Sequence, residues 1–434
     1  MNILRHQDSD FEKTIRELCQ RPPFDPAVEK AAREILDDVQ ANGDRALTKY
    51  ARKFDGVSLN PDQFRVSEEE LDNAADSLDA SVKKTIRTAQ RQVRDFARQR
   101  MPQPWSYSPR KGVIIGERFA PLDRIGAYVP GGTAPLVSTV LHTVTLAAAA
   151  GVSEIVVVTP PQPDGRVHPA LLYAADKAGA TQVFRLGGVY AIGALAYGTE
   201  TVKKVEKIVG PGNAYVTAAK RHVYGYVSLD LVAGPSEIMI LADESANPAF
   251  VAADMLSQIE HGSGAESAVL ATPSETLLEN VQAELLAQSK ERERRDTIET
   301  CLRNNVHLIL VANLEQAAEV ASRYAPEHLE IQTQRPGMLA KKVTAAGAVF
   351  LGPWTPEPVG DFVAGPSHVL PTGGAARYFS GLTVDAFFRR MSVVNYQKSA
   401  LRRERETLET FAEIEGLDAH GMSTGIRFRE ENDS

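Results

Sequence analysis

Hydrophobic and polar positions divide the chain into a helical first quarter and a long region in which strand and helix patterns alternate. In the first quarter, Asp25 is an N-cap residue followed by Pro26 at the first helical position, and an amphipathic pattern continues to Gly43. Ser67 and Glu70 have the spacing of a capping box and open a further helical pattern. These local signals predict a first quarter built mostly of helices.

The period of the pattern changes near Gly112. From there, short runs rich in β-branched residues alternate with helical patterns, and these runs are GVIIGERF, IGAYV, EIVVVTP, QVFRLGG, EKIVGPG, SEIMILAD, SAVLATP, VHLILVAN, HLEIQ and GAVFLG. Alternation of this kind is typical of parallel sheets with helices on their faces. The expected fold class is α/β, with two Rossmann-like parallel-sheet domains and small helical extensions at the N- and C-termini.

The expected domain boundaries follow the same changes of pattern. Residues 1–22 are expected to form an N-terminal helical arm. The first α/β domain is expected to span 23–127 together with 238–382, and the second to span 128–237. Residues 383–434 are expected to form a C-terminal helical tail, which is too small to bury a core of its own. We therefore expect this tail to pack on another domain or on another subunit.

Composition narrows the class of protein. With 434 residues, 43% of them apolar, the chain is long enough for several domains with sizeable cores. The net charge of -8 and the lack of a basic block argue against nucleic-acid binding. The sequence opens without a secretory pattern, and its longest small-apolar run, Leu141 to Gly151, is too short and too polar to cross a bilayer. Cys19 and Cys301 lie outside any CxxC motif. We therefore expect a cytoplasmic protein with no membrane contact and no thiol chemistry.

A candidate metal site begins at the end of the helical pattern VAADMLSQIEH. Gln258 and His261 are three residues apart, which places them on one helix face, and both offer a neutral donor atom. Asp361 and His420 would complete a set of oxygen and nitrogen donors that suits zinc. Each feature also has a plainer interpretation: a solvent-facing helix end for the pair, a turn residue for Asp361 and a surface histidine for His420. Spacing alone leaves both interpretations open.

A candidate acid-base pair follows Pro326, at the start of a proline- and glycine-rich stretch, residues 326–368. Glu327 and His328 are adjacent, so in an extended segment their side chains point to opposite sides, which suits two separate proton transfers. Imidazole and a tuned carboxyl group both serve as general bases near neutral pH. The alternative is an ordinary loop before the strand pattern HLEIQ. The remaining histidines are expected to be solvated or packing residues, and they are His6, His142, His168, His222 and His307.

Three glycine-rich turns suggest a nucleotide site: YVPGGTAP, RLGGVYAIGALAYG and VGPGNAYV. Each follows a strand pattern and precedes a helical one, so backbone amides at the helix start can meet a pyrophosphate. None has the G-x-G-x-x-G fingerprint, because Tyr215 stands where the third glycine after Gly210 and Gly212 belongs. By itself the pattern indicates the turn glycines of an α/β fold more strongly than it indicates NAD.

Taken together, the motifs resemble one family. The strings YVPGG, GPGNAYVTAAKR, AGPSE, LSQIEHG, PEHLEI, GPSHVLPT and EGLDAHG, in this order, are similar to those of the histidinol dehydrogenase family, from about residue 25 to 427. The resemblance implies oxidation of L-histidinol through the aldehyde to L-histidine, the last step of histidine biosynthesis, with reduction of two NAD molecules. It also implies one zinc ion (Zn2+) per subunit and a homodimer whose active site is shared between subunits.

The resemblance also implies roles for particular residues. Glu327 and His328 would be the catalytic acid-base pair, in the first α/β domain, and NAD would bind to the second domain. The implied zinc ligands are Gln258, His261, Asp361 and, from the partner subunit, His420. The implied substrate contacts are Ser236, Gln258, His261, His328, Asp361, His368, Glu415 and His420. The implied NAD contacts are Tyr128, Tyr190 and Asn213, where Tyr190 departs from the glutamine that the family often has in this turn.

Two rival functions fit parts of the same pattern. A dehydrogenase on the same scaffold could oxidise another small primary alcohol, such as a sulfopropanediol. Glu415 and His368 argue for histidinol, because a carboxylate beside the substrate favours a cationic amino alcohol over an anionic sulfonate. A zinc-binding protein without catalysis is the other rival, and the presence of Glu327 and His328 beside the expected ligands argues against it.

Overall fold

The structure is a computed structural model that describes residues 1–20, 25–131, 135–232 and 234–431. The chain divides into two compact units. The large unit consists of Met1–Arg100 and Leu122–Phe387, and the small unit consists of Met101–Pro121 and Phe388–Ser434. Within the described ranges, no helix combines the length and the apolar composition needed to span a bilayer.

The first sheet of the large unit has six parallel strands: β1 (Asn2–Arg5), β9 (Glu237–Ala242), β10 (Ser267–Thr272), β11 (Val306–Leu310), β12 (His328–Gln332) and β13 (Ala348–Leu351). Their order is β1-β11-β10-β9-β12-β13. Ranked along the chain from β9, five of them follow the order 3-2-1-4-5, which is that of a doubly wound α/β sheet. The expected parallel sheet is confirmed.

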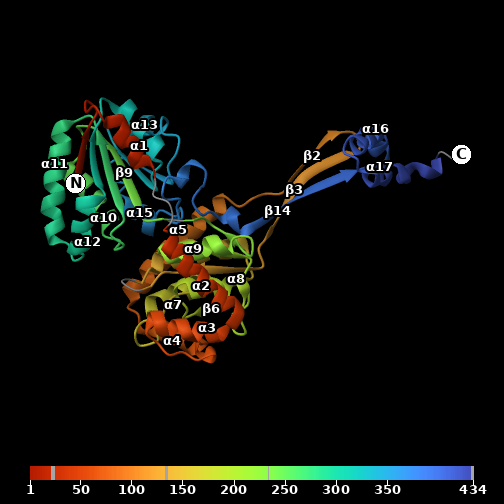
Figure 1. Cartoon of the computed structure of the whole chain (residues 1–434), viewed down its shortest axis with the longest axis horizontal. Helices are drawn as coiled ribbons and strands as arrows, with labels where there is room; N and C mark the ends of the chain where they lie inside the picture. Colours follow the sequence, from red (N-terminus) through yellow and green to blue (C-terminus); the bar gives the residue numbers. More distant parts are fainter. Residues whose placement is uncertain (21–24, 132–134, 233, 432–434) are drawn as a thin grey trace. The chain divides into compact units, whose positions relative to one another are not determined.

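Helices cover both faces of the six-stranded sheet: α10 (Pro248–Ile259), α11 (Glu275–Gln288) and α12 (Arg295–Asn304) on one, and α1 (Phe11–Cys19) and α13 (Leu314–Tyr324) on the other (Figure 1). Alternate residues of β9 enter the two cores, so that Ile240 packs with the first group and Leu241 with the second. Burial on both faces explains why these strands are almost continuously apolar. Two short helices, α14 (Pro336–Ala340) and α15 (Glu357–Phe362), follow β12 and β13.

The second sheet of the large unit has five parallel strands: β4 (Arg124–Tyr128), β5 (Glu154–Val158), β6 (Gln182–Phe184), β7 (Lys207–Val209) and β8 (Ser228–Leu229). Their order, β6-β5-β4-β7-β8, is again 3-2-1-4-5 along the chain. The strand order reverses between β4 and β7 here, and between β9 and β12 in the other sheet. Two Rossmann-like sheets are therefore present, as the alternating pattern predicts.

One face of the five-stranded sheet shares a core with α2 (Pro26–Asn42), α3 (Asp44–Tyr50), α8 (Gly188–Tyr197) and α9 (Ala214–Val223). A π-helical turn, Ala51–Asp55, continues α3. A further helix, α6 (Val137–Ala150), contacts β4 and β5 of this sheet. It also packs against α5 (Ala80–Gln99) and α7 (Pro169–Ala178), and α7 contacts α4 (Glu68–Ser77). The helices from α2 to α5 therefore belong with this sheet, whereas α1 belongs with the six-stranded one.

That placement differs from the expected boundaries, which group 23–127 with the zinc-carrying domain. Leu36 and Val39 of α2 enter the core of the five-stranded sheet and pack with α8. The expected helical arm, 1–22, also differs, because it opens with β1, which pairs with β11 at the sheet edge before α1 begins. The end of that arm, at 21–22, lies outside the described residues. Contacts with residues distant in the sequence determine the positions of α2 and β1, and local sequence patterns do not predict such contacts.

The small unit contains an antiparallel sheet followed by two helices: β2 (Trp105–Arg110), β3 (Val113–Pro121), β14 (Phe388–Tyr396), α16 (Lys398–Ile414) and α17 (Asp418–Gly425) (Figure 1). The strand expected at GVIIGERF is confirmed, although it joins this antiparallel sheet. The helical pattern expected at the start of the tail is wrong, because β14 pairs with β3 along its whole length. Backbone pairing and the β-branched residues Val393 and Val394 override the helical spacing there.

Candidate active site

A cluster of buried polar groups lies at the amino ends of β9 and β12. His328 begins β12, and its Nδ1 lies 3.1 Å from the main-chain oxygen of Glu237, which begins β9. A carbonyl oxygen only accepts, so Nδ1 carries the proton and Nε2 keeps its lone pair. Among the described residues, Nε2 has no hydrogen-bond partner. Burial lowers the pKa of His328 to about 4, so near neutral pH the imidazole is uncharged and Nε2 is available as a base.

Glu327 lies beside this imidazole, with its Oε2 3.7 Å from His328 Nδ1. The same oxygen accepts a hydrogen bond of 3.0 Å from the main-chain nitrogen of Glu237. Both side chains therefore contact the main chain of Glu237, whereas the sequence predicts that they point to opposite sides. The reason is that Glu327 precedes β12, so the alternation of side chains along the strand does not apply to it. Burial raises the pKa of Glu327 well above its ordinary value, and the charges of Glu237 and Asp361 act in the same direction.

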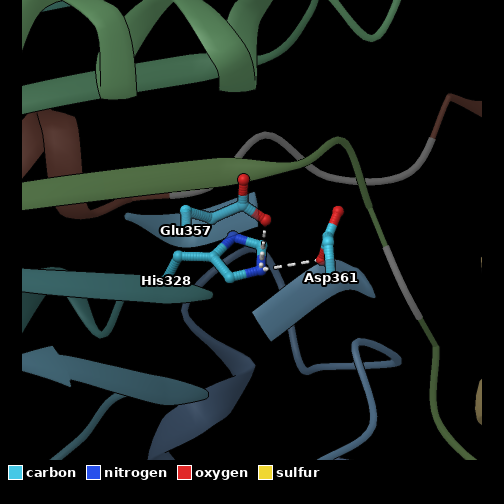
Figure 2. Close-up of side chains that lie close together, drawn as sticks. All are labelled: His328, Glu357 and Asp361. Atoms are coloured by element: carbon cyan, nitrogen blue, oxygen red, sulfur yellow. Dashed lines mark ion pairs between the residues drawn. The ribbon is translucent and has the colours of Figure 1, made fainter. Parts of the chain in front are cut away.

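Helix α15 brings two further carboxyl groups to His328, as Figure 2 shows. His328 Nε2 lies 3.6 Å from Glu357 Oε1 and 4.0 Å from Asp361 Oδ1. Burial, together with the charge of Asp361, raises the pKa of Glu357 to about 10, so this group keeps its proton near neutral pH. Burial opposes the ionisation of Asp361, but His368, His328 and a hydrogen bond with Glu357 lower its pKa. The negative charge of this pair therefore rests on Asp361.

These groups are close enough to hold one metal ion. The ligand atoms of His328, Glu357 and Asp361 all lie within 4.8 Å of one another. This set shares only Asp361 with the ligands that the resemblance implies. Glu357 is a site residue that sequence reasoning misses, and the available signal is its position four residues before Asp361, which puts both on one face of a helix.

Gln258 and His261 stand at the end of α10. Gln258 is fully buried, and its Oε1 has no hydrogen-bond partner within the described part of the chain. His261 Nδ1 lies 2.8 Å from the main-chain oxygen of Gln258 and 3.2 Å from Gln258 Nε2. The shorter contact is with a carbonyl oxygen, which only accepts, so we assign the ring proton to Nδ1, and Nε2 is then the atom that can bind a metal. His261 also lies close enough to Asp361 to lower the pKa of that carboxyl group. An unpartnered amide oxygen, a free imidazole nitrogen and an ionised carboxylate are donors that suit zinc.

His368 extends the cluster toward the five-stranded sheet. Its Nδ1 lies 3.7 Å from Asp361 Oδ1, and its Nε2 lies 3.3 Å from the hydroxyl oxygen of Thr139 in α6. The His368 ring stacks on that of His142, with 4.6 Å between ring centroids. His142 is fully buried, so it is the packing residue expected, but it packs at the site. Ser236 directly precedes β9 and so stands at the same end of the sheet as His328.

Tyr128 and Asn213 lie at the carboxyl edge of the five-stranded sheet. Tyr128 ends β4, and Asn213 is the N-cap of α9, where its Oδ1 accepts from the main-chain nitrogen of Tyr215 at 3.0 Å. The strand order reverses between β4 and β7, and doubly wound sheets bind ligands outside the carboxyl ends of the strands at such a point. The location suits a dinucleotide. Residues 132–134 of the YVPGGTAP turn lie outside the described residues.

Tyr190 is directed into the core beneath these turns. It is fully buried, its hydroxyl donates to the carboxylate of Asp55, and its ring stacks on Tyr50 with 6.3 Å between centroids. In the adjacent turn, the hydroxyl of Tyr128 accepts a hydrogen bond of 3.3 Å from the main-chain nitrogen of Gly188. The burial of Tyr190 favours a role in supporting the turn over the direct NAD contact that the sequence predicts.

Replacing Tyr190 with phenylalanine tests these two roles. We expect urea unfolding to show a loss of about 1–3 kcal/mol in the free energy of unfolding, because the Asp55 carboxylate loses the hydrogen bond that the Tyr190 hydroxyl donates. We expect its KM for NAD to stay within about twofold of that of the unmodified protein. Tyr215→Phe, at an exposed position of α9, is the control and should change the unfolding free energy by less than about 0.5 kcal/mol. A large rise in the KM for NAD without a loss of stability would show direct contact instead.

Glu415 and His420 belong to the small unit. Glu415 follows α16, His420 lies in α17, and both side chains are exposed. Gln258, His261 and Asp361 belong to the large unit. The completion of a four-ligand set by His420 therefore stays a prediction.

A switch-point site on one Rossmann-like sheet and a buried histidine and carboxylate cluster on the other define an α/β enzyme of the dehydrogenase class. The sequence model described as histidinol dehydrogenase matches residues 20–428. The chain therefore belongs to the histidinol dehydrogenase family, whose members are oxidoreductases of histidine biosynthesis.

Relatives and a solved structure agree along the chain. The histidinol dehydrogenase of Heliobacterium mobile is 45% identical over 394 residues, which cover 91% of this chain and 92% of the relative. That of a Synechococcus species is 44% identical over 429 residues, or 98% of each chain. The crystal structure of histidinol dehydrogenase from Elizabethkingia anophelis superposes with a TM-score of 0.93 at 34% identity, covering 100% of this chain and 99% of that one. The resemblance seen in the motifs is confirmed.

Proposed function

We propose that this chain catalyses the four-electron oxidation of L-histidinol through L-histidinaldehyde to L-histidine, with two NAD molecules as hydride acceptors and zinc as the metal. The observation that carries the proposal is a contact between the proposed NAD site on the five-stranded sheet and the polar cluster around His328 and Asp361. Thr139 lies near the start of α6, the helix that follows β4, and its hydroxyl is 3.3 Å from His368 Nε2. A dinucleotide at the switch point would therefore have the cluster around Asp361 as its neighbour.

His328 is the base in the proposed first oxidation. Its Nδ1 donates to Glu237, so its Nε2 is free to take the hydroxyl proton as the carbinol carbon loses a hydride. The low pKa of this buried imidazole keeps it uncharged before the reaction. Asp361, 4.0 Å away, then stabilises the imidazolium that proton transfer creates. His328 Nε2 thus accepts the substrate proton, and the carboxylate of Asp361 lies beside it.

Glu327 is the base in the proposed second half of the reaction, where water adds to the aldehyde and a second hydride is lost. Its pKa is raised, so the ionised form is a stronger base than an ordinary glutamate. The main-chain nitrogen of Glu237 holds one carboxylate oxygen, which fixes the direction of the other. The adjacent positions of Glu327 and His328 allow each to serve one of the two oxidations.

Gln258, His261 and Asp361 would hold the zinc ion in this unit. When bound, zinc supplies a Lewis-acid template for the imidazole and amino groups of the substrate, and NAD supplies the hydride acceptor. His368 and Ser236 would line the substrate pocket, and Tyr128 and Asn213 would contact NAD. We also propose a cytoplasmic location for this chain.

The proposed assembly is a homodimer in which His420 and Glu415 of the partner subunit complete each site. The small unit supports this proposal because it exposes large apolar side chains. Val394 is 66% exposed, Phe411 59% and Ile414 75%. Apolar surface of this extent on a small unit is typical of a surface covered by another chain.

The decisive experiment measures NADH formation from L-histidinol by the purified protein, first as isolated, then after chelation and again after zinc is restored. We expect two NADH per histidinol, loss of turnover with the metal and recovery with zinc. A sulfopropanediol tested in parallel should give no NADH. If the protein bound zinc but histidinol gave no NADH, the substrate assignment would be wrong, and turnover of the sulfonate would identify the rival function.

A further inference from the structure

A second cluster of polar side chains lies next to the site on the same face of the six-stranded sheet. His328, Glu330 and Gln332 alternate along β12 and therefore point to one face, whereas Leu329 and Ile331 enter the core on the other. Glu330 is 1% exposed and Gln332 3% exposed, so neither group reaches water. Strands that are polar on one face usually turn that face to solvent, and this one does not.

Hydrogen bonds join this cluster to two helices. Gln332 Nε2 donates to Asp254 Oδ2 in α10 at 2.8 Å and to Glu330 Oε2 at 3.0 Å. The other oxygen of Glu330, Oε1, accepts from the main-chain nitrogen of Glu357, the first residue of α15, at 2.8 Å. Three elements are therefore cross-linked by three side chains.

The three elements are those that carry the large-unit part of the site. Asp254 lies one helical turn before Gln258, and Glu357 lies one turn before Asp361. Glu330 itself lies two residues after His328 on the same strand face. A shift of any element relative to the others would change the distances among the base and the expected zinc donors.

Stability alone does not account for such a cluster. Buried carboxyl groups carry a desolvation cost, and replacing a buried polar network with well-packed apolar residues is often neutral or stabilising. Hydrogen bonds, in contrast, fix direction and distance, so this network restrains the elements that it joins, although Gln332 Oε1 has no hydrogen-bond partner among the described residues. The expected benefit of this cluster is therefore geometric.

We propose that Glu330, Gln332 and Asp254 are positioning residues that hold α10 and α15 against β12, and so set the separation of Gln258, His328 and Asp361. The proposal deepens the proposed function and rests on it. It assigns no contact with substrate or NAD to the three residues. They act on the zinc site only through the main chain of Glu357 and the orientation of the two helices.

The test compares two substitutions at Glu330 in the full-length protein. Glu330→Leu keeps a similar volume but removes both acceptors, whereas Glu330→Gln keeps an acceptor for the Glu357 amide. We expect Glu330→Leu to weaken zinc binding about 10–100-fold in a chelator competition assay and to lower kcat by a similar factor, as loss of outer-sphere support does in metal sites. We expect Glu330→Gln to recover most of both. The KM for NAD should not change, because the expected NAD contacts lie on the other sheet.

Leu285→Ala provides a control for stability, because Leu285 is a buried residue of α11 that packs in the core of the same sheet. It should lower the unfolding free energy while leaving zinc affinity and kcat nearly unchanged. The proposal fails if Glu330→Leu loses stability in the same way but binds zinc and turns over as the unmodified protein does. It also fails if Glu330→Gln is as impaired as Glu330→Leu, because the acceptor to Glu357 would then be irrelevant.

Gln332→Met keeps the proposal testable if Glu330→Leu does not fold. Methionine has a similar length but lacks the amide that joins Asp254 to Glu330, so zinc affinity and kcat should fall together, and unchanged values would overturn the proposal. Substituting cobalt for zinc adds a spectroscopic readout, because a displaced ligand alters the visible absorption of the metal. Failure of the proposed function would look different: the unmodified protein itself would bind no zinc or give no NADH from histidinol.

Discussion

His328→Gln is expected to lower kcat for histidinol oxidation by about 10²–10⁴-fold, the range that positioned general bases supply. The glutamine amide can still donate toward the main-chain oxygen of Glu237, which His328 Nδ1 contacts at 3.1 Å. It cannot take up a proton near neutral pH, as the free Nε2 of the buried imidazole can. Steady-state kinetics at saturating histidinol and NAD measure the effect.

A matched control separates loss of the base from a general disturbance of the sheet. His307 lies in β11 of the same sheet and takes no part in the proposed site. His307→Gln should therefore keep kcat within about threefold. A loss of less than tenfold in His328→Gln would exclude His328 as the base for the rate-limiting step.

Lys220→Met is expected to lower the unfolding free energy by about 3–5 kcal/mol, the range for removing one partner of a buried ion pair. The side chains of Lys220 and Asp230 are 3% and 0% exposed, and they form an ion pair. The Lys220 ammonium group also donates to the main-chain oxygen of Gly210 at 2.9 Å, and Asp230 Oδ2 accepts from the nitrogen of the same residue at 2.7 Å. Without the lysine, a buried carboxylate is left beside the VGPGN turn.

Urea unfolding of the full-length protein checks this value, and a double variant identifies its cause. Lys220→Met with Asp230→Asn removes the uncompensated charge, so it should be more stable than Lys220→Met alone. Because the pair holds the turn before Asn213, we also expect the KM for NAD to rise in the single variant. If the double variant were the less stable of the two, the hydrogen bonds that the Asp230 carboxylate accepts from Gly210 and Leu231 would matter more than its uncompensated charge.

Much of the fold is predictable from the sequence because its signals are local. Asp25 caps α2 through a hydrogen bond of 2.8 Å from the main-chain nitrogen of Ala27, and Ser67 accepts one of 3.1 Å from that of Glu70, as the two cap patterns predict. The alternation of strand and helix patterns likewise predicts both parallel sheets. The position of the N-terminal helices and the strand β14 are not predictable in this way, because partners distant in the sequence determine them.

The candidate site shows the same division. Glu327, His328 and Asp361 lie in motifs distinctive enough to be found from the sequence, and the structure brings them together. Glu357 and Glu330 are not found, because their importance depends on burial. The run HLEIQ looks like a strand with one face in water, and only the covering helices α10 and α15 make Glu330 a buried group.

Both parallel sheets of the large unit contain five strands in the order 3-2-1-4-5. The cluster around His328 nevertheless lies at the amino ends of the strands in one sheet, whereas the proposed dinucleotide contacts lie at the carboxyl ends of the strands in the other. For protein engineering, this arrangement separates two properties that many enzymes combine in one cleft. Coenzyme preference can be redesigned on β4 to β8 and their following turns, while metal preference can be redesigned on α10, β12 and α15. Thr139 and His368, where the two regions touch, are the positions at which the two redesigns must be made compatible.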